Sequence, residues 1–326
     1  YQVVGSDNPD RLVGANPVGI ILSEYSLQDP RAWDYIRPIL LENDGWAVFI
    51  YTPRGRNHGY TLLKNAQKSP KWFSQVLDVG TTGAVTEEAI QEERDAGMPE
   101  ELIQQEFYCS FDAALVGAYY GTAMEIALKA KRIGDFPFDS QLPVHTAWDL
   151  GIGDQTVILF YQLSMGQIRI IDCFSSSGEG LAFYVNKLSQ GHRAHYSYGT
   201  HYAPHDIQAR DLSTGRTRLE TAQKLGLRFR VVPKVSIEDG IEATRSIMSR
   251  IYWNEDKNTE HLIEAARQYH KEWDAKKRCF NDKPYHDWTS DFMDALRYMA
   301  LSIRREDSKR KPLPTHAISD YEPMYT

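Results

Sequence analysis

The amino-acid sequence predicts an α/β protein built from two parts, and three observations lead to that class. Through residues 1–120, short continuous apolar runs, typical of buried strands, alternate with helical segments. The second part opens with three strand-like runs joined by short polar turns, which indicate an antiparallel meander, and then alternates helix and strand. Between the two parts, residues 134–140 are rich in Gly, Pro and Asp, which is typical of a domain boundary.

The expected elements of the first part follow from its apolar runs and helical periodicity. In chain order they are strands at 18–22, 46–51 and 72–79 and helices at 31–41 and 86–108, the last interrupted at Gly97-Met-Pro99. The first helix should begin after Pro30. The second should begin at Thr86, because a hydroxyl followed by glutamates is typical of a helix start. Gly, Pro and Asn punctuate residues 52–59, where a loop is expected.

The second part is expected to hold five strands and five helices. The strands are expected at 144–150, 156–163, 167–174, 198–205 and 227–232, and the helices at 181–188, 217–225, 237–251, 259–273 and 288–304. We therefore divide the chain into a first domain at 1–120, a linker at 121–142 and a second domain at 143–305. A basic and then Pro-rich tail at 306–326 is expected to be flexible.

The bulk composition limits the possible function classes. The chain has 326 residues, 42% of them hydrophobic and 25% charged, which is ordinary for a soluble protein with two cores. No apolar stretch has the length of a membrane span, and the first residues lack a signal sequence. The formal net charge of −7 argues against a general nucleic-acid coat, but a local basic groove remains possible. The three cysteines are far apart, which fits a reducing cytosol better than a disulfide framework or a zinc ribbon.

Three aspartates stand in contexts that point to chemistry. Asp149 ends the apolar run His145-Thr-Ala-Trp-Asp and precedes a Gly-rich turn, and Asp206 ends a second strand-like run. A strand, an acid and a turn together deliver a carboxylate to the carboxyl edge of a sheet. Asp294 lies in a helical pattern later in the chain and can complete the cluster. Carboxylates held close together repel each other unless a divalent cation neutralises them, so the three predict a site for two Mg²⁺ or Mn²⁺ ions, the usual apparatus for cleaving a phosphodiester.

The last expected helix carries further acids. Asp287, Asp291 and Asp294 are spaced four and three apart, so they share one helical face. A solvated acidic start, favoured by the helix dipole, explains the first two well. It explains Asp294 poorly, because that residue lies about two turns into the helix among apolar neighbours. We expect Asp294 to be a ligand, Asp291 to assist it, Asp287 to cap the helix and Asp154 to be a turn residue.

Basic residues follow the second aspartate closely. Arg210, Arg216, Arg218 and Lys224 either solvate a helix or hold a DNA backbone beside the metal site. Both interpretations fit the sequence.

A cluster of histidines lies just before the second aspartate. His192, His195, His201 and His205 span a helix end, a turn and a strand, which disfavours a shared zinc ion. His205 can assist the site next to Asp206, and the others are expected on the polar surface.

The order and contexts of these motifs resemble the large terminase subunit of tailed phages, a DNA-packaging motor. In the second part the resemblance is carried by Trp148-Asp149-Leu-Gly, Ala203-Pro-His-Asp206, Thr214-Gly-Arg-Thr-Arg218 and Asp294-Ala-Leu-Arg-Tyr298. In the first part, Gly19-Ile-Ile-Leu-Ser-Glu24-Tyr and Tyr51-Thr-Pro-Arg-Gly55 resemble the back half of the terminase ATPase. The match runs from residue 1 to about residue 305.

The resemblance implies an incomplete P-loop-type ATPase domain followed by an RNase H-like mixed-sheet nuclease domain, whose first and fourth strands are neighbours. It implies Glu24, Thr52 and Arg54 as ATPase residues, with Ser23 where most such enzymes have an Asp. A Gly-x-x-x-x-Gly-Lys-Ser/Thr phosphate loop is missing from the sequence, so ATP is expected as a cofactor only of the full-length protein. Because the chain starts at Tyr1 in strand-like sequence, we expect it to be a piece of that longer protein.

The function implied is a metal-dependent endonuclease that cuts concatemeric double-stranded DNA, with ATP-driven DNA translocation into the procapsid in full length. The implied partners are double-stranded DNA, the small terminase subunit and the portal protein, in the host cytoplasm and not in the mature virion. A stand-alone RNase H-like nuclease, such as a resolvase or transposase, is one alternative, although it has no reason to carry the two ATPase-like motifs. A non-catalytic portal-docking module is the other.

Overall fold

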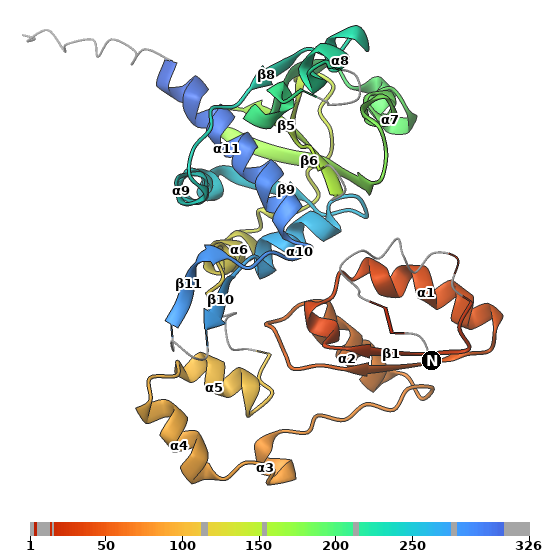
Figure 1. Cartoon of the computed structure of the whole chain (residues 1–326), viewed down its shortest axis with the longest axis vertical. Helices are drawn as coiled ribbons and strands as arrows, with labels where there is room; N and C mark the ends of the chain where they lie inside the picture. The colour runs from red at the N-terminus through yellow and green to blue at the C-terminus, as the bar shows by residue number, and fades with distance from the viewer. Residues whose placement is uncertain are drawn as a thin grey trace, which may run out of the picture.

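The computed structural model describes residues 3–4, 14, 16–111, 117–151, 155–210, 215–274 and 279–309. The protein is mixed α/β, with a two-stranded parallel sheet in its first part and a seven-stranded mixed sheet in its second (Figure 1). None of the described helices is both long and apolar enough to cross a bilayer.

The first part is built on one β-α-β unit. Strand β1 (Gly19–Ser23) is followed by helix α1 (Arg31–Glu42) and by β2 (Trp46–Ile50), which pairs parallel with β1. Ile36 and Leu40 of α1 are buried against one face of the two strands. On the other face Ile21 and Val48 remain exposed, because strand side chains alternate between faces. Helices α2 (His58–Lys68), α3 (Val79–Thr82), α4 (Glu87–Asp95) and α5 (Glu100–Glu106) complete this part.

The strand expected at 72–79 is wrong. Residues 72–78 belong to no strand, α3 begins at Val79, and Phe73 is 87% exposed. The apolar, β-branched composition of this segment gives it strand propensity, but a strand also needs a neighbouring strand to pair with. The expected loop after β2 is shorter than predicted, because Asn57 caps α2 by accepting a hydrogen bond from the Gly59 amide.

The second part confirms the expected meander and its crossover. Strands β4 (Val144–Asp149), β5 (Gln155–Ser164) and β6 (Gln167–Ser177) are antiparallel neighbours, and β7 (Tyr198–Ala203) pairs parallel with β4. The sheet order is β3-β9-β6-β5-β4-β7-β8, with β8 at Phe229–Val231. The first and fourth strands of this part, β4 and β7, are therefore neighbours, as the resemblance stated above implies.

Two strands of this sheet were not expected from the sequence. The helix expected at 237–251 ends at Ile247, and strand β9 (Ile251–Asn254) follows after a 3-10 turn. Strand β3 (Ile133–Gly134), within the expected linker, pairs with β9. Trp253 is completely buried beside Ile170 of β6. The β-branched and aromatic residues of 251–253 fill a pleated surface better than a helix end.

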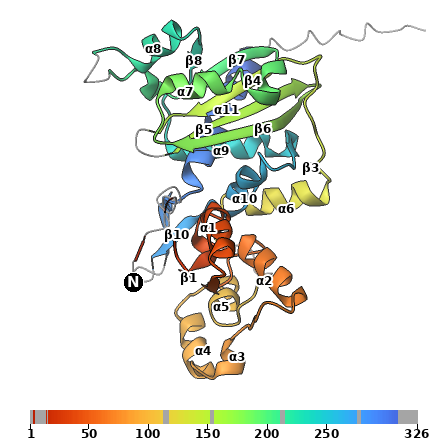
Figure 2. The same ribbon diagram turned by 90° about the vertical axis from the view of Figure 1, so that its right-hand side faces the viewer.

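Helices cover both faces of the sheet (Figure 2). Helices α7 (Leu181–Lys187) and α8 (Arg218–Lys224) lie on one side, and α9 (Ile237–Ile247), α10 (Glu260–Gln268), α11 (Ser290–Lys309) and α6 (Gly121–Lys129) on the other. The helix expected at 259–273 ends early, because residues 271–274 form strand β10 (Lys271–Asp274), which pairs with β11 (Cys279–Pro284).

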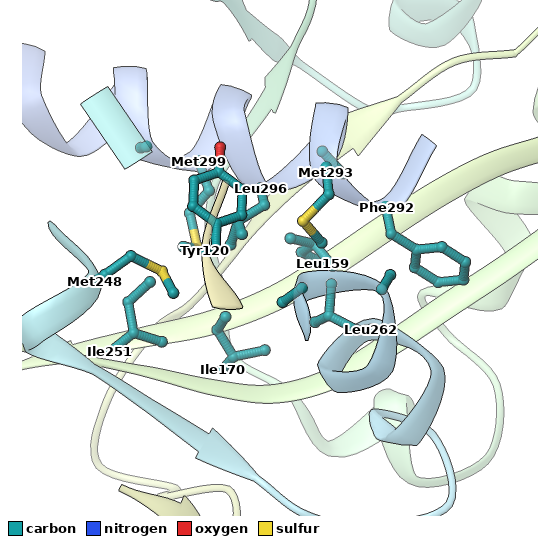
Figure 3. Close-up of a cluster of buried hydrophobic side chains, with 14 of the residues drawn as sticks. Tyr120, Leu159, Ile170, Met248, Ile251, Leu262, Phe292, Met293, Leu296 and Met299 are labelled. Atoms are coloured by element: carbon teal, nitrogen blue, oxygen red, sulfur yellow. The ribbon is translucent and has the colours of Figure 1, made fainter. Parts of the chain in front are cut away.

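Helix α11 is fixed to the sheet by its apolar side. Phe292, Met293, Leu296 and Met299 are buried and point into the core (Figure 3). Burial of one such side chain stabilises the fold by roughly 1.5–3 kcal/mol. This packing fixes the rotation of α11, and so determines where its acidic face lies.

A hydrogen-bonded chain of side chains joins β4 to β7. Trp148 Nε1 donates to Thr146 Oγ1 at 2.7 Å, and Thr146 Oγ1 lies 2.7 Å from His201 Nδ1. The Thr146 hydroxyl accepts from tryptophan and uses its proton or its second lone pair to bond Nδ1 of His201. Burial, with a smaller effect from His145, lowers the pKa of His201 to about 4. The surface position expected for His201 is wrong, since it is buried.

The buried, hydrogen-bonded His201 predicts that the protein loses stability in acid. The pKa of His201 is about 4 in the folded protein and about 6.5 when unfolded, so the unfolded state takes up a proton first as pH falls. The free energy of unfolding should therefore decrease by about 3 kcal/mol between pH 6.5 and pH 4 relative to His201→Gln. Urea titrations of both proteins across this range measure the difference, and two parallel pH profiles would contradict the assignment.

Candidate active site

Two neighbouring strands bring the first two aspartates to the same edge of the sheet. Asp149 is the last residue of β4, after the fully buried Trp148. Strand β7 ends at Ala203, and Pro204 leads into a short 3-10 turn, His205–Gln208, that contains Asp206. Because Ala147 pairs with Tyr202 in parallel, both acids emerge at the carboxyl edge.

The N-terminal turns of α11 bring the other acids to this edge. Asp287 precedes the helix, and its Oδ1 accepts hydrogen bonds from the backbone amide and the hydroxyl of Thr289 at 2.9 and 2.5 Å. Asp287 therefore forms a turn ahead of Ser290, the first residue of the helix, and does not cap an amide within the helix as expected. Asp291 and Asp294 lie on the helix itself and are partly exposed, while α11 packs against β4 and β7.

The pKa of Asp149 shows that these acids act on one another. Burial raises it well above its usual range, and the negative charges of Asp294, Asp291 and Asp206 raise it further. Burial also raises the pKa of Asp294, where the positive charge of Arg297 opposes the shift. A concentration of negative charge in a half-buried place is therefore the main electrostatic property of this edge.

Hard carboxylate oxygens are the donors that Mg²⁺ and Mn²⁺ prefer, so the residue types fit such an ion. In this structure the described carboxylates do not form a complete metal-coordination shell. Among the described residues, no three His, Cys, Asp or Glu side chains converge closely enough to bind one ion together. Asp294 Oδ1 instead lies 2.5 Å from Arg297 Nη2.

Three residues near the acids were not singled out from the sequence. Arg297 pairs with Asp294, and His286 lowers the pKa of the same carboxyl group. The pKa of Tyr298 is raised by burial and then by Asp149 and Asp294. Arg297 and Tyr298 belong to the motif Asp294-Ala-Leu-Arg-Tyr298, and their spacing of three and four from Asp294 places them on one face of a helix.

A basic pocket lies beyond Asp206. It measures about 580 Å³ and is lined by Arg210, Gly215, Arg216, Glu220, Gln223 and Lys224. Three of the four predicted DNA-binding residues thus share one hollow. The fourth, Arg218, lies elsewhere, with Nη1 3.4 Å from the Leu150 carbonyl oxygen, next to Asp149.

The remaining expected residues fall into separate places. His205 is exposed beside Asp206, whereas His192 Nε2 lies 2.9 Å from the buried Asp172, which also pairs with Arg193. Asp154 lies outside the described residues.

The three predicted ATPase residues lie together at one end of the β1–β2 sheet. Glu24 directly follows β1 in a left-handed conformation with φ of 54°, which costs a side-chain-bearing residue roughly 1–3 kcal/mol. The hydroxyl of Ser26 donates to the Thr52 carbonyl oxygen at 2.6 Å, so the turn after β1 is tied to the loop after β2. Arg54 of that loop pairs with Glu106 of α5 at 2.5 Å.

The first part contacts the second close to the acidic edge. Arg31 Nη2 donates to Gln155 Oε1 at 3.2 Å, and Gln155 begins the strand that follows Asp149 in the sequence. Near the start of α2, His58 Nδ1 lies 4.0 Å from Glu264 Oε1 of α10.

Comparison with known proteins finds similar structures of phage large terminases. The chain is similar to the large terminase from a thermophilic bacteriophage, with 12% identity over 89% of this chain and 71% of that one and a TM-score of 0.44. It is also similar to the large terminase nuclease from thermophilic phage G20c with bound cobalt, with 15% identity, 57% and 97% coverage and a TM-score of 0.40. The P22 large terminase nuclease domain matches with 17% identity, 53% and 89% coverage and a TM-score of 0.39. No family model and no curated protein sequence matches. At these identities and TM-scores the likenesses carry no functional argument.

The charge crowding predicts that the acidic edge destabilises the metal-free protein. Asp149 has a raised pKa when folded, so ionising it at neutral pH costs more in the folded than in the unfolded state. Asp149→Asn should therefore raise the melting temperature by a few degrees at pH 7 in chelator, and the gain should shrink as pH falls through the raised pKa. Asp206→Asn, at an exposed position, is the control and should change it less. A lower melting temperature for Asp149→Asn in calorimetry would contradict this explanation.

Proposed function

We propose that this chain is a metal-dependent endonuclease of the phage large-terminase type, which cuts concatemeric double-stranded DNA in the host cytoplasm. The observation that supports it most is the placement of four interacting carboxylates, from the end of β4, the turn after β7 and the start of α11, at one edge of the sheet. The raised pKa of Asp149 shows that these carboxylates interact electrostatically. A purely structural acidic edge would hold mutually repelling carboxylates together with Arg297 offsetting the repulsion only in part.

In the proposed site, Asp149, Asp206 and Asp294 would hold two divalent cations, with Asp291 assisting. When bound, Mg²⁺ or Mn²⁺ ions activate a water molecule and stabilise the leaving oxygen of the phosphodiester. The chain itself holds the carboxylates in place. The backbone of β4 and β7 fixes two carboxylates, the buried side of α11 fixes the others, and no protein nucleophile is required.

The basic pocket has the charge to hold the DNA backbone. Arg210, Arg216 and Lys224 gather on the side of Asp206, and Arg218 lies against the residue that follows Asp149. Contacts of this kind to phosphates position a duplex without reading its sequence.

The first part has a second, separate role in this proposal. Its Glu24 turn and its Thr52–Arg54 loop are joined by the hydrogen bond from Ser26 to Thr52, as expected of a unit whose loop responds to a nucleotide beside the acid. In the full-length protein this unit would belong to an ATP-driven motor that translocates DNA, with the small terminase subunit and the portal protein as partners.

The nuclease assignment predicts metal-dependent cutting of plasmid. The purified chain should nick and linearise supercoiled DNA with Mg²⁺ or Mn²⁺, because a cation is needed to bring the carboxylates together. Asp149→Ala should abolish cutting while keeping its melting transition. The assay is gel electrophoresis of plasmid over time. Cutting in excess chelator, or by Asp149→Ala, would place the active site elsewhere.

The pocket predicts a salt-dependent loss of DNA binding. Arg216→Gln with Lys224→Gln should weaken duplex binding equally for unrelated sequences, because the lost contacts are to phosphates. Each lost contact should reduce the slope of log affinity against log salt by about 0.9. Arg228→Gln with Lys234→Gln removes the same charge from exposed positions that do not line the pocket, and should change little. Fluorescence anisotropy at three salt concentrations measures the DNA affinity of both double variants. Equal losses of affinity in the two would refute a specific role for the pocket.

A further inference from the structure

Arg297 is an unusual residue for its position. It lies in the apolar middle of α11, between Leu296 and Met299, and is 7% exposed. Its Nη2 donates to Asp294 Oδ1 at 2.5 Å, and its Nη1 is buried with no hydrogen-bond partner among the described residues. A charged group is thus removed from water and only partly compensated, which opposes folding.

The structure makes room for this side chain. Gly240 of α9 faces it, and a Cβ at residue 240 would lie 3.1 Å from Arg297 Cδ. Besides Asp294, the phenol groups of Tyr269, Tyr298 and Tyr120 interact with it electrostatically. A methionine would fill much of the same space without burying a charge.

A second Arg–acid ion pair with the same three-residue spacing shows that this spacing alone does not explain the burial of Arg297. Arg245 and Glu242 of α9 are also three residues apart, with Nη1 and Oε1 at 2.5 Å. Both are well exposed, at 45% and 65% of their side chains, against 8% for Arg297 and 31% for Asp294. The Arg245 pair is an ordinary surface ion pair, which contributes little. The Arg297 pair differs in its burial and in the acid that it holds.

We infer that Arg297 is a positioning residue for the third metal-binding carboxylate. Its guanidinium group holds Oδ1 of Asp294 and counters the charge of the acidic edge, which leaves Oδ2 for a divalent cation shared with Asp149. Because Nη1 is buried, Arg297 cannot itself contact DNA. This inference rests on the proposed metal site. Hydrogen-bonding partners of ligating carboxylates typically contribute about 10–100-fold to metal affinity.

The test is Mn²⁺ binding without DNA, measured by titration calorimetry on wild type, Arg297→Met, Arg297→Lys and Arg245→Met, with melting curves to confirm folding. Arg297→Met should bind Mn²⁺ about 10–100-fold more weakly than wild type. Arg297→Lys keeps the positive charge but lacks the planar guanidinium group, so its loss of Mn²⁺ affinity should be smaller but measurable. Arg245→Met, the matched surface variant, should bind as wild type. In DNA cleavage, Arg297→Met should lower kcat at fixed Mn²⁺ and leave the KM for DNA unchanged.

Each outcome separates this inference from the proposed function. Wild-type Mn²⁺ affinity in folded Arg297→Met would overturn the role of Arg297, and if that variant does not fold, wild-type affinity in Arg297→Lys would do the same. Equal weakening in Arg245→Met would also overturn it, since the effect would then be one of general charge. If wild type binds no Mn²⁺, or Asp149→Ala binds it unchanged, the metal site itself is absent and the proposed function fails.

Discussion

Repulsion between carboxylates at one half-buried edge is the constraint on which the second part of this protein depends. Burial and the negative charges of Asp294, Asp291 and Asp206 raise the pKa of Asp149 well above its usual range. These acids stay together only if the surrounding helices and strands contribute more free energy to holding them than their mutual repulsion costs. The surrounding structure has the features of such a scaffold.

The scaffold acts from both faces of the sheet. On one side, the apolar residues of α11 bury themselves against β5 and α10, so the acidic face of the helix cannot rotate away (Figure 3). Within the sheet, the hydrogen bonds from Trp148 through Thr146 to His201 hold β4 beside β7. Arg297 places a positive charge next to the acid furthest along the chain. The first part of the chain also touches this edge, because Arg31 binds Gln155 at the start of β5.

Much of this arrangement could be predicted from sequence, because it depends on local patterns. The strand, acid and turn at Asp149 indicated a carboxylate at a sheet edge, and the neighbouring position of β7 followed from the RNase H-like resemblance. What could not be predicted depends on tertiary partners. Residues 251–254 follow an expected helix and form a strand because β6 offers them an edge. Residues 72–79 have strand propensity, but no strand lies beside them in the part of the chain that the structure describes. The burial of His201 and the pairing of Arg297 depend on the helices and strands that pack around them, which no local pattern encodes.

The central claim is that Asp149, Asp206 and Asp294 bind divalent cations together. Anomalous scattering from crystals soaked in Mn²⁺ tests it most directly. The account predicts two anomalous peaks between the ends of β4 and β7 and the first turns of α11, with Asp149 oxygens within about 2.5 Å of both. Peaks only at other carboxylates, such as Glu24, or no peak at this edge in crystals that bind Mn²⁺ elsewhere, would contradict it.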